Sequence, residues 1–105
     1  MTELCLHVLI VLGDGPLHGY AIGKDVERSS GGRLDPATGS LYQVLKRLTD
    51  DGLIRMAAAP GTGDARRKYF ELTPAGRRQA AEEIKRLDSM VRAARRRQLF
   101  RAVTP

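Results

Sequence analysis

The final third of the chain predicts one long helix, and this helix limits the possible folds more than any other feature. Thr73-Pro74 is typical of a helix start, because a threonine hydroxyl accepts hydrogen bonds from free backbone amides and proline suits the first helical position. A helix of about 25 residues follows, roughly 37 Å long at 1.5 Å per residue. A chain of 105 residues is too small to cover such a helix alone.

Apolar residues recur along this helix at alternating spacings of four and three residues. The series comprises Ala80, Ile84, Leu87, Val91 and Ala94, continues to Gln98, and has Met90 beside it. Such spacing produces the narrow apolar seam of helices that pack side by side. The seam either completes the core of its own chain or meets a second copy, and we favour the homodimer.

The N-terminal segment is a second candidate for contact between subunits. Residues 2–12 predict a helix that is apolar almost all round, so it needs neighbours on several sides. We place Leu4 and Val8 at the dimer interface, to which residues 1–13 contribute. A membrane span is not expected, because the apolar run Leu4–Leu12 has nine residues and a membrane helix needs about 20.

Two further helices are predicted in the first half of the chain. Residues 13–16 are rich in glycine and proline and separate the first helix from a second one over residues 18–28, in which Gly19 and Gly23 allow another helix to approach closely. Asp35-Pro36 is again a start signal and opens a third helix that ends at Gly52. Its inward stripe consists of Leu41, Val44, Leu45 and Leu48.

A β-hairpin follows the third helix. Leu53–Ala58 and Lys68–Leu72 are short runs typical of strands, and segment 60–64 between them contains proline and glycine. Three helices, this hairpin and a closing helix define a winged helix-turn-helix. We therefore expect a mainly α fold (α+β) with a two-stranded β wing. Residues 1–73 form the DNA-binding domain of this class, and residues 74–105 form the C-terminal dimerisation helix.

Positive charge is concentrated in the second half of the chain. Residues 53–105 carry 13 basic and five acidic side chains, whereas residues 1–52 carry five basic and seven acidic ones. Clustered Lys and Arg attract phosphates, and the released counterions supply affinity. The asymmetry indicates double-stranded DNA as a partner, with solubility as the alternative. The run Arg92, Arg95, Arg96, Arg97 and Arg101 either adds to this attraction or is a solvated helix face.

Three motifs resemble the PadR family of bacterial transcriptional regulators: LHGYAI at 17–22, GSLYQVLKRLTDDGLI at 39–54 and RRKYFELTPAGRR at 66–78. The resemblance covers nearly the whole chain, whose length is similar to that of the short subgroup with a single C-terminal dimerisation helix. The resemblance implies a homodimeric repressor on an inverted-repeat operator. It also implies a small-molecule effector at the dimer interface, but only Phe100 among the aromatic residues lies near that interface. A peptide, a protein partner, Cys5 oxidation or no effector remain open.

The resemblance places the start of the third helix against DNA. The candidate contacts are Pro36, Ala37, Thr38, Gly39, Ser40, Tyr42, Gln43, Lys46 and Arg47. Small residues permit close approach to the duplex, and the free amides of a helix N-terminus suit a phosphate. Gln43 can both donate to and accept from adenine, so we predict that it reads a base, with a solvated glutamine as the alternative. Many relatives carry proline at this position, so no base preference is carried over.

The remaining DNA candidates are wing residues. Arg66, Arg67 and Lys68 stand where the loop re-enters its second strand, and the resemblance implies contacts to phosphates or to a minor groove. Because side chains alternate along a strand, we predict that two of the three reach DNA. Tyr42 is either a core aromatic or a residue whose ring packs while its hydroxyl reaches a phosphate.

Catalysis and metal binding are not expected from the residues present. His7 and His18 are the only histidines, and the single cysteine, Cys5, excludes an internal disulfide and a multi-cysteine zinc site. We assign His18 a structural hydrogen-bonding role in the LHGY turn. Cys5 and His7 lie two residues apart and diverge on a helix, so we expect no metal and no other cofactor. A reducing cytoplasm fits this cysteine usage.

Two alternatives come from other functional classes. The first is a winged-helix module whose wing and third helix dock on an acidic protein. The second is a dimeric small-molecule-binding protein without a specific DNA site. The salt dependence of binding separates these alternatives in part from a DNA-binding regulator.

Overall fold

The computed structural model describes residues 1–36, 38–61 and 63–102 of the chain. Ala37, one of the expected DNA contacts, lies outside the described residues, as does the side chain of Thr38. The elements in chain order are α1 (Glu3–Val11), the 3₁₀ helix η1 (Leu12–Asp14), β1 (Leu17–His18), α2 (Gly19–Ser29), α3 (Thr38–Asp50), β2 (Ile54–Ala57), β3 (Tyr69–Leu72), α4 (Pro74–Arg96) and the 3₁₀ helix η2 (Leu99–Ala102).

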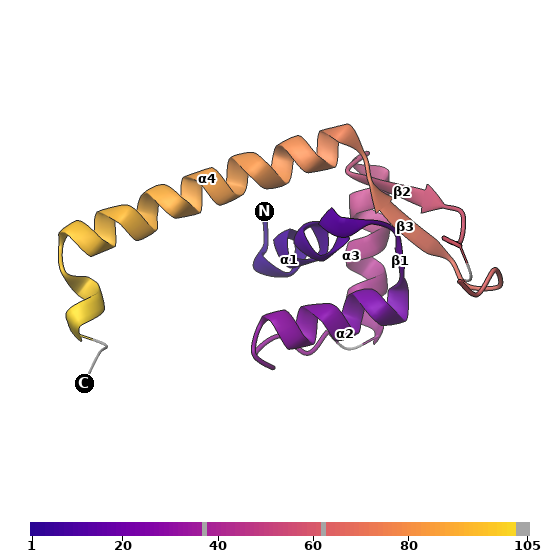
Figure 1. Ribbon diagram of the computed structural model, residues 1–105, viewed down its shortest axis with the longest axis horizontal. Helices are drawn as coiled ribbons and strands as arrows, with labels where there is room; N and C mark the ends of the chain where they lie inside the picture. The colour runs from indigo at the N-terminus through magenta and orange to yellow at the C-terminus, as the bar shows by residue number, and fades with distance from the viewer. Residues whose placement is uncertain (37, 62, 103–105) are drawn as a thin grey trace.

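The first three helices and the sheet gather at one end of α4, and the rest of α4 projects away from them (Figure 1). The molecule is accordingly elongated, with principal extents of 50 × 27 × 25 Å. Among the described residues, no helix combines the length and the apolar character that a membrane crossing requires.

Three helices begin at a side chain that caps their first turn. The Thr2 hydroxyl accepts a hydrogen bond from the Cys5 amide at 3.2 Å, and the Thr73 hydroxyl accepts one from the Gly76 amide at 3.0 Å. His18 Nδ1 accepts from the Ala21 amide at 3.1 Å at the start of α2. The predicted Thr73-Pro74 start and the structural role of His18 are therefore confirmed.

The start of α3 differs from the prediction. The helix begins at Thr38, so Asp35 and Pro36 precede it and proline is not its first residue. Leu34 packs against the core, and its amide donates to the Ser30 hydroxyl at 2.9 Å. Because this anchor holds the chain as it leaves α2, Asp35 and Pro36 serve as part of a connection rather than as the first turn of α3.

In the part of the chain that the structure describes, the sheet has three strands, one more than the predicted wing. β2 pairs antiparallel with β3, with Ile54 opposite Leu72 and Met56 opposite Phe70, which confirms the hairpin. The two-residue strand β1 pairs with the other edge of β3, with His18 opposite Tyr69. The strand order is therefore β1-β3-β2. A strand of only two residues is too short to show an alternation of apolar and polar side chains, so the sequence could not reveal β1.

The core lies between the first three helices and one face of the sheet. Its fully buried large side chains are Val8, Leu9, Leu12, Ile22, Val26, Leu45 and Ile54. α2 and α3 approach closely where predicted, because a Cβ atom at Gly23 would lie only 3.3 Å from Leu41 Cδ2. Leu41, Leu45 and Leu48 of the predicted inward stripe are buried and Val44 is half-buried, which confirms the orientation of α3.

Two residues predicted at the dimer interface belong instead to the core of their own chain. Val8 has no exposed surface and Ala80 exposes 8%. The reason is that α1 contacts α2, α3 and α4 of its own chain, which covers most of its apolar surface, although Ile10 still exposes 45%. Leu4 packs on the same core and keeps part of its surface exposed.

The outer part of α4 carries an uncovered apolar face. Ile84, Leu87, Met90 and Val91 expose between 38% and 58% of their surface. The seam predicted from the spacing is thus not part of this chain's core beyond Ala80. The helix ends at Arg96, so Gln98 lies outside it and adopts the left-handed φ of +62°.

Candidate nucleic-acid interface

Burial of one side of α3 leaves the opposite side exposed. Because Leu41, Leu45 and Leu48 point into the core, the exposed residues of the helix include Gly39, Ser40, Tyr42, Gln43, Lys46 and Arg47. Gly39, Gln43 and Lys46 follow one another at spacings of four and three, so they lie along one line of the helix surface. A Cβ atom at Gly39 would meet nothing within 4 Å, so the first turn of α3 is open to close approach.

Lys46 does not stand alone on this surface. Its ammonium group lies 2.9 Å from the Asp50 carboxylate, and the hydrogen bond and charge of Asp50 raise the pKa of Lys46. Both side chains are well exposed, so water screens the pair and its net contribution to stability is small. Lys46 can therefore exchange Asp50 for another anion at little cost.

Tyr42 is an exposed residue with one packed edge. It exposes 56% of its surface, so it is not a core aromatic. A Cβ atom at Gly19 would lie 3.6 Å from Tyr42 Cε1 and 3.7 Å from its hydroxyl oxygen, so the ring edge rests against the first turn of α2. A Cβ atom at these distances would be in ordinary van der Waals contact, so the ring edge and the first turn of α2 are close neighbours.

The wing cations lie in a turn rather than in a strand. β3 begins at Tyr69, and the Arg67 amide donates to the Asp64 carbonyl at 3.1 Å in the turn before it. The Asp64 carboxylate accepts from the Arg66 amide at 2.9 Å and from Arg66 Nε at 3.3 Å, which lowers the pKa of Asp64. Strand alternation is therefore the wrong argument for the directions of these side chains, because the turn sets them.

One groove brings α3 and the wing together. It has a volume of about 450 Å³, with Tyr42 and Lys46 of α3 on one side and Arg67 and Lys68 of the wing on the other. Its lining also includes Tyr20, Thr49, Met56 and Phe70, which sequence reasoning did not single out. Period two along β2 gave a misleading signal, because Met56 lies two residues from the buried Ile54 and yet exposes 53%.

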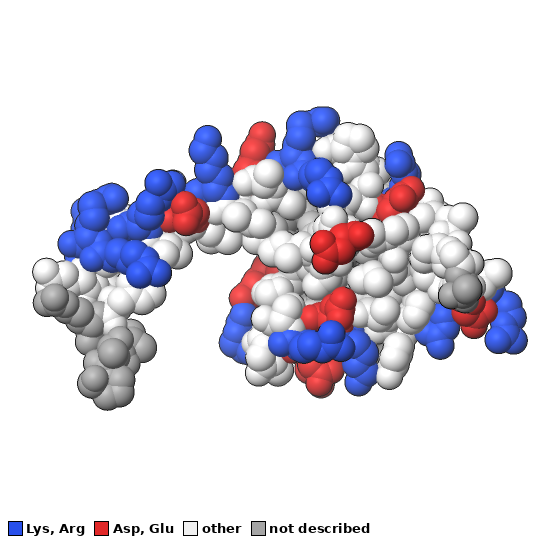
Figure 2. Space-filling view, in the orientation of Figure 1, with Lys and Arg blue, Asp and Glu red and all other residues white. Residues whose placement is uncertain are grey.

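The other predicted residues lie away from this groove. Arg47 lies on the far side of α3, in a separate hollow with Met1 and Gln79. Pro36 lies beside α2, in a shallow hollow that also contains Lys24 and Glu27. Figure 2 shows Lys and Arg at the outer end of the wing and over the far end of α4, with Asp and Glu interspersed over the middle of the molecule.

The residues suited to hold a metal ion or cofactor are dispersed. In the part of the chain that the structure describes, no group of three or more His, Cys, Asp and Glu side chains is placed to bind a metal. His7 Nδ1 is buried without a hydrogen-bond partner among the described residues, and the Cys5 thiol is buried in the core.

Three packed helices, a small antiparallel sheet and a hairpin beside the exposed third helix define a winged helix-turn-helix protein. A family model described as the transcriptional regulator PadR-like family matches residues 8–82. The chain belongs to this PadR-like family of transcriptional regulators. The family that the three sequence motifs indicated is thereby confirmed.

Known relatives cover the chain to different extents. The transcriptional regulator Rv3488 of Mycobacterium tuberculosis is 37% identical over 87 residues, which are 83% of this chain and 78% of that protein. An uncharacterized 37.1 kDa protein in transposon Tn4556 of Streptomyces fradiae is 44% identical over 98 residues, or 93% of this chain, which spans only 25% of that protein. The crystal structure of Bacillus subtilis PadR in complex with operator DNA is similar with a TM-score of 0.66 at 28% identity, over 80% of this chain and 48% of that chain.

Proposed function

We propose that this chain is a sequence-specific DNA-binding repressor that acts as a homodimer on an inverted-repeat operator. The observation that carries the proposal is the shared groove, to which α3 and the wing both contribute exposed cations. A winged helix places its third helix in the major groove and its wing along the adjacent backbone. The operator complex of the related Bacillus subtilis PadR supports the same use of this fold.

In this proposal α3 enters the major groove along the line of Gly39, Gln43 and Lys46. Gly39 allows the backbone to come close, Gln43 reads a base edge, and Lys46 leaves Asp50 for a phosphate. The residues from Pro36 to Ser40 and the Tyr42 hydroxyl lie against the phosphates at the entry of the helix, and Arg47 serves those on its far side. Arg66 and Lys68 contact phosphates from the wing.

The uncovered face of α4 supports the homodimer. Contiguous exposed apolar side chains are typical of protein interfaces, and this face offers four of them on one helix. The proposed interface consists of Leu4, Ile84, Leu87, Met90, Val91 and Ala94. A two-fold symmetric pair would hold two α3 helices at half-sites about 34 Å apart, which is one turn of DNA.

Replacement of Gln43 tests the base-reading role. We expect Gln43→Ala to change the preferred base at one or two positions and to weaken binding to the wild-type site by about 1–3 kcal/mol, because a bidentate base contact is lost. Selection of bound sequences from a randomised DNA pool measures the preference. Lys68→Ala is the matched control, since it should weaken binding to all sequences alike and lower the salt slope by about 0.9.

An unchanged preference in the Gln43→Ala variant would show that this glutamine is solvated. If the wild-type chain retained no DNA at low salt, the proposed function itself would be wrong. The same fold would then serve to dock an acidic protein or to bind a small molecule as a dimer.

A further inference from the structure

The first residues of α2 lie between the two parts of the proposed DNA-binding surface. Gly19 receives the edge of Tyr42 from α3. The preceding residue, His18, pairs with Tyr69 in the sheet, and its ring meets the Tyr69 ring edge-on with centroids 5.5 Å apart. Because β3 is the second strand of the wing, the segment 17–20 contacts α3 on one side and the base of the wing on the other.

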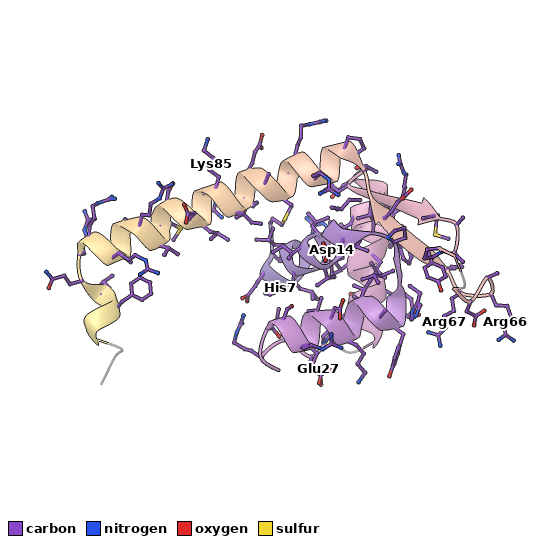
Figure 3. The ribbon with its side chains drawn as sticks, viewed as in Figure 1. His7, Asp14, Glu27, Arg66, Arg67 and Lys85 are labelled. Atoms are coloured by element: carbon purple, nitrogen blue, oxygen red, sulfur yellow. The ribbon has the colours of Figure 1, made fainter. Side chains whose placement is uncertain are left out.

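Arg67 is the wing residue that reaches this segment. Its Nη1 lies 3.2 Å from His18 Nδ1, and its guanidinium carbon lies 5.9 Å from the centre of the Tyr20 ring. Figure 3 shows Arg67 near the start of α2, whereas Arg66 extends from the outer end of the wing. Arg66 and Arg67 both pair with Asp64 inside the wing, at 3.3 Å and 3.8 Å, but the side chain of Arg67 also bonds to His18, outside the wing.

The chemistry of the contact suits arginine in particular. His18 Nδ1 accepts a hydrogen bond from the Ala21 amide, so it carries a lone pair and the ring proton belongs on Nε2. The Arg67 guanidinium donates to the same lone pair and also lies against an aromatic ring. A planar guanidinium can donate and stack at once, whereas a lysine ammonium is a compact point charge.

We propose that Arg67 is a positioning residue that docks the wing onto the start of α2 through His18 and Tyr20. This inference rests on the proposed function and refines it, because Arg67 then sets the distance between wing and α3 while Arg66 and Lys68 contact phosphates. The start of α2 then contacts both elements, since Tyr42 of α3 packs beside Gly19 and Arg67 of the wing bonds to His18. A duplex meets both elements at a preset separation.

The docked wing is the binding-competent state in this proposal. If the wing is docked in only a fraction of the molecules, the apparent affinity for DNA is reduced to that fraction of its full value. Each phosphate contact is unchanged once it has formed. Loss of the Arg67 contact should therefore lower affinity without removing a phosphate contact. Loss of a phosphate contact should instead reduce the number of released counterions.

Three variants separate these two roles: Arg67→Lys, Arg67→Ala and, as the matched control, Arg66→Ala. We expect both Arg67 variants to bind DNA about tenfold more weakly with the wild-type salt slope, because docking of the wing is lost. Arg66→Ala should lower the slope by about 0.9. If Arg67 contacts a phosphate instead, Arg67→Lys will bind like the wild type and Arg67→Ala will lower the slope, which overturns the proposal.

A measurement without DNA makes the inference independent of the proposed function. NMR order parameters of the amides of Gly63 and residue 67 should fall from about 0.85 toward 0.6 in both Arg67 variants and stay unchanged in Arg66→Ala. If the order parameters are unchanged in Arg67→Lys, Arg67 does not dock the wing. If they fall but the variant binds DNA as tightly as the wild type, docking of the wing plays no part in DNA binding. If the wild type binds no DNA, the proposed function fails, and the order parameters still decide whether Arg67 docks the wing.

Discussion

Leu87→Glu is expected to convert the proposed homodimer into monomers and to abolish tight operator binding. Leu87 lies in the middle of the uncovered face of α4 and exposes 38% in the single chain. A symmetric interface would bury two added carboxylates, and an unpaired buried charge costs about 3–5 kcal/mol, which corresponds to a dimer dissociation constant raised at least a hundredfold. Sedimentation velocity over a range of concentrations measures the dimer, and gel retardation measures the DNA complex.

The loss of DNA binding follows because the two DNA-binding modules are no longer linked to each other. Two linked modules gain about 10²- to 10⁴-fold in affinity over either one alone. Ser89→Glu is the matched control, because it adds the same charge at an exposed position two residues further along, on the opposite side of the helix. Ser89→Glu should stay dimeric. A Leu87→Glu variant that sediments like the wild type would remove α4 from the interface.

Gly76→Ala is expected to destabilise the fold strongly, although the same change normally favours a helix. A Cβ atom at Gly76 would lie 1.9 Å from the Leu53 carbonyl oxygen and 2.8 Å from its carbon. The Thr73 amide donates to the same oxygen at 3.1 Å, so the backbone at this point is held and cannot move away cheaply. We expect a loss of about 3 kcal/mol or more, and a melting temperature lower by roughly 12 °C or more.

Denaturant and thermal unfolding measure this loss at one fixed protein concentration, since the proposed dimer would make the apparent stability depend on concentration. Gly39→Ala is the control, because a Cβ atom there meets nothing within 4 Å and alanine favours a helix by up to about 1 kcal/mol. Gly39→Ala should therefore unfold at the same temperature as the wild type or higher. Equal stability of Gly76→Ala and the wild type would mean that α4 does not dock on Leu53 as described.

Much of the architecture could be predicted because its signals are local. The cap at Thr73, the inward stripe of α3 and the two hairpin strands all lie where their spacing and capping residues placed them. The family could also be predicted, because its motifs carry these same signals in order. The predicted start of α3 was wrong, since the packing of Leu34 and its hydrogen bond to Ser30 override the Asp35-Pro36 signal.

Only part of the candidate site could be predicted from the sequence. The exposed side of α3 follows from its periodicity, so Gln43 and Lys46 could be found. Met56 could not, because its exposure depends on which part of the sheet α3 leaves uncovered. The direction of Arg67 also depends on a turn and on a histidine 49 residues away, which no local pattern encodes.

The amino-acid sequence alone determined which segments form helices and strands, because capping, side-chain periodicity and turn residues act over a few neighbouring positions. Only the tertiary structure decided which apolar surfaces remain uncovered. It buried Val8 and Ala80 within one chain, left the outer face of α4 free, and joined β1 to the wing through His18 and Tyr69. The physical reason is that burial and pairing are properties of two surfaces in contact, and the second surface lies far away in the chain.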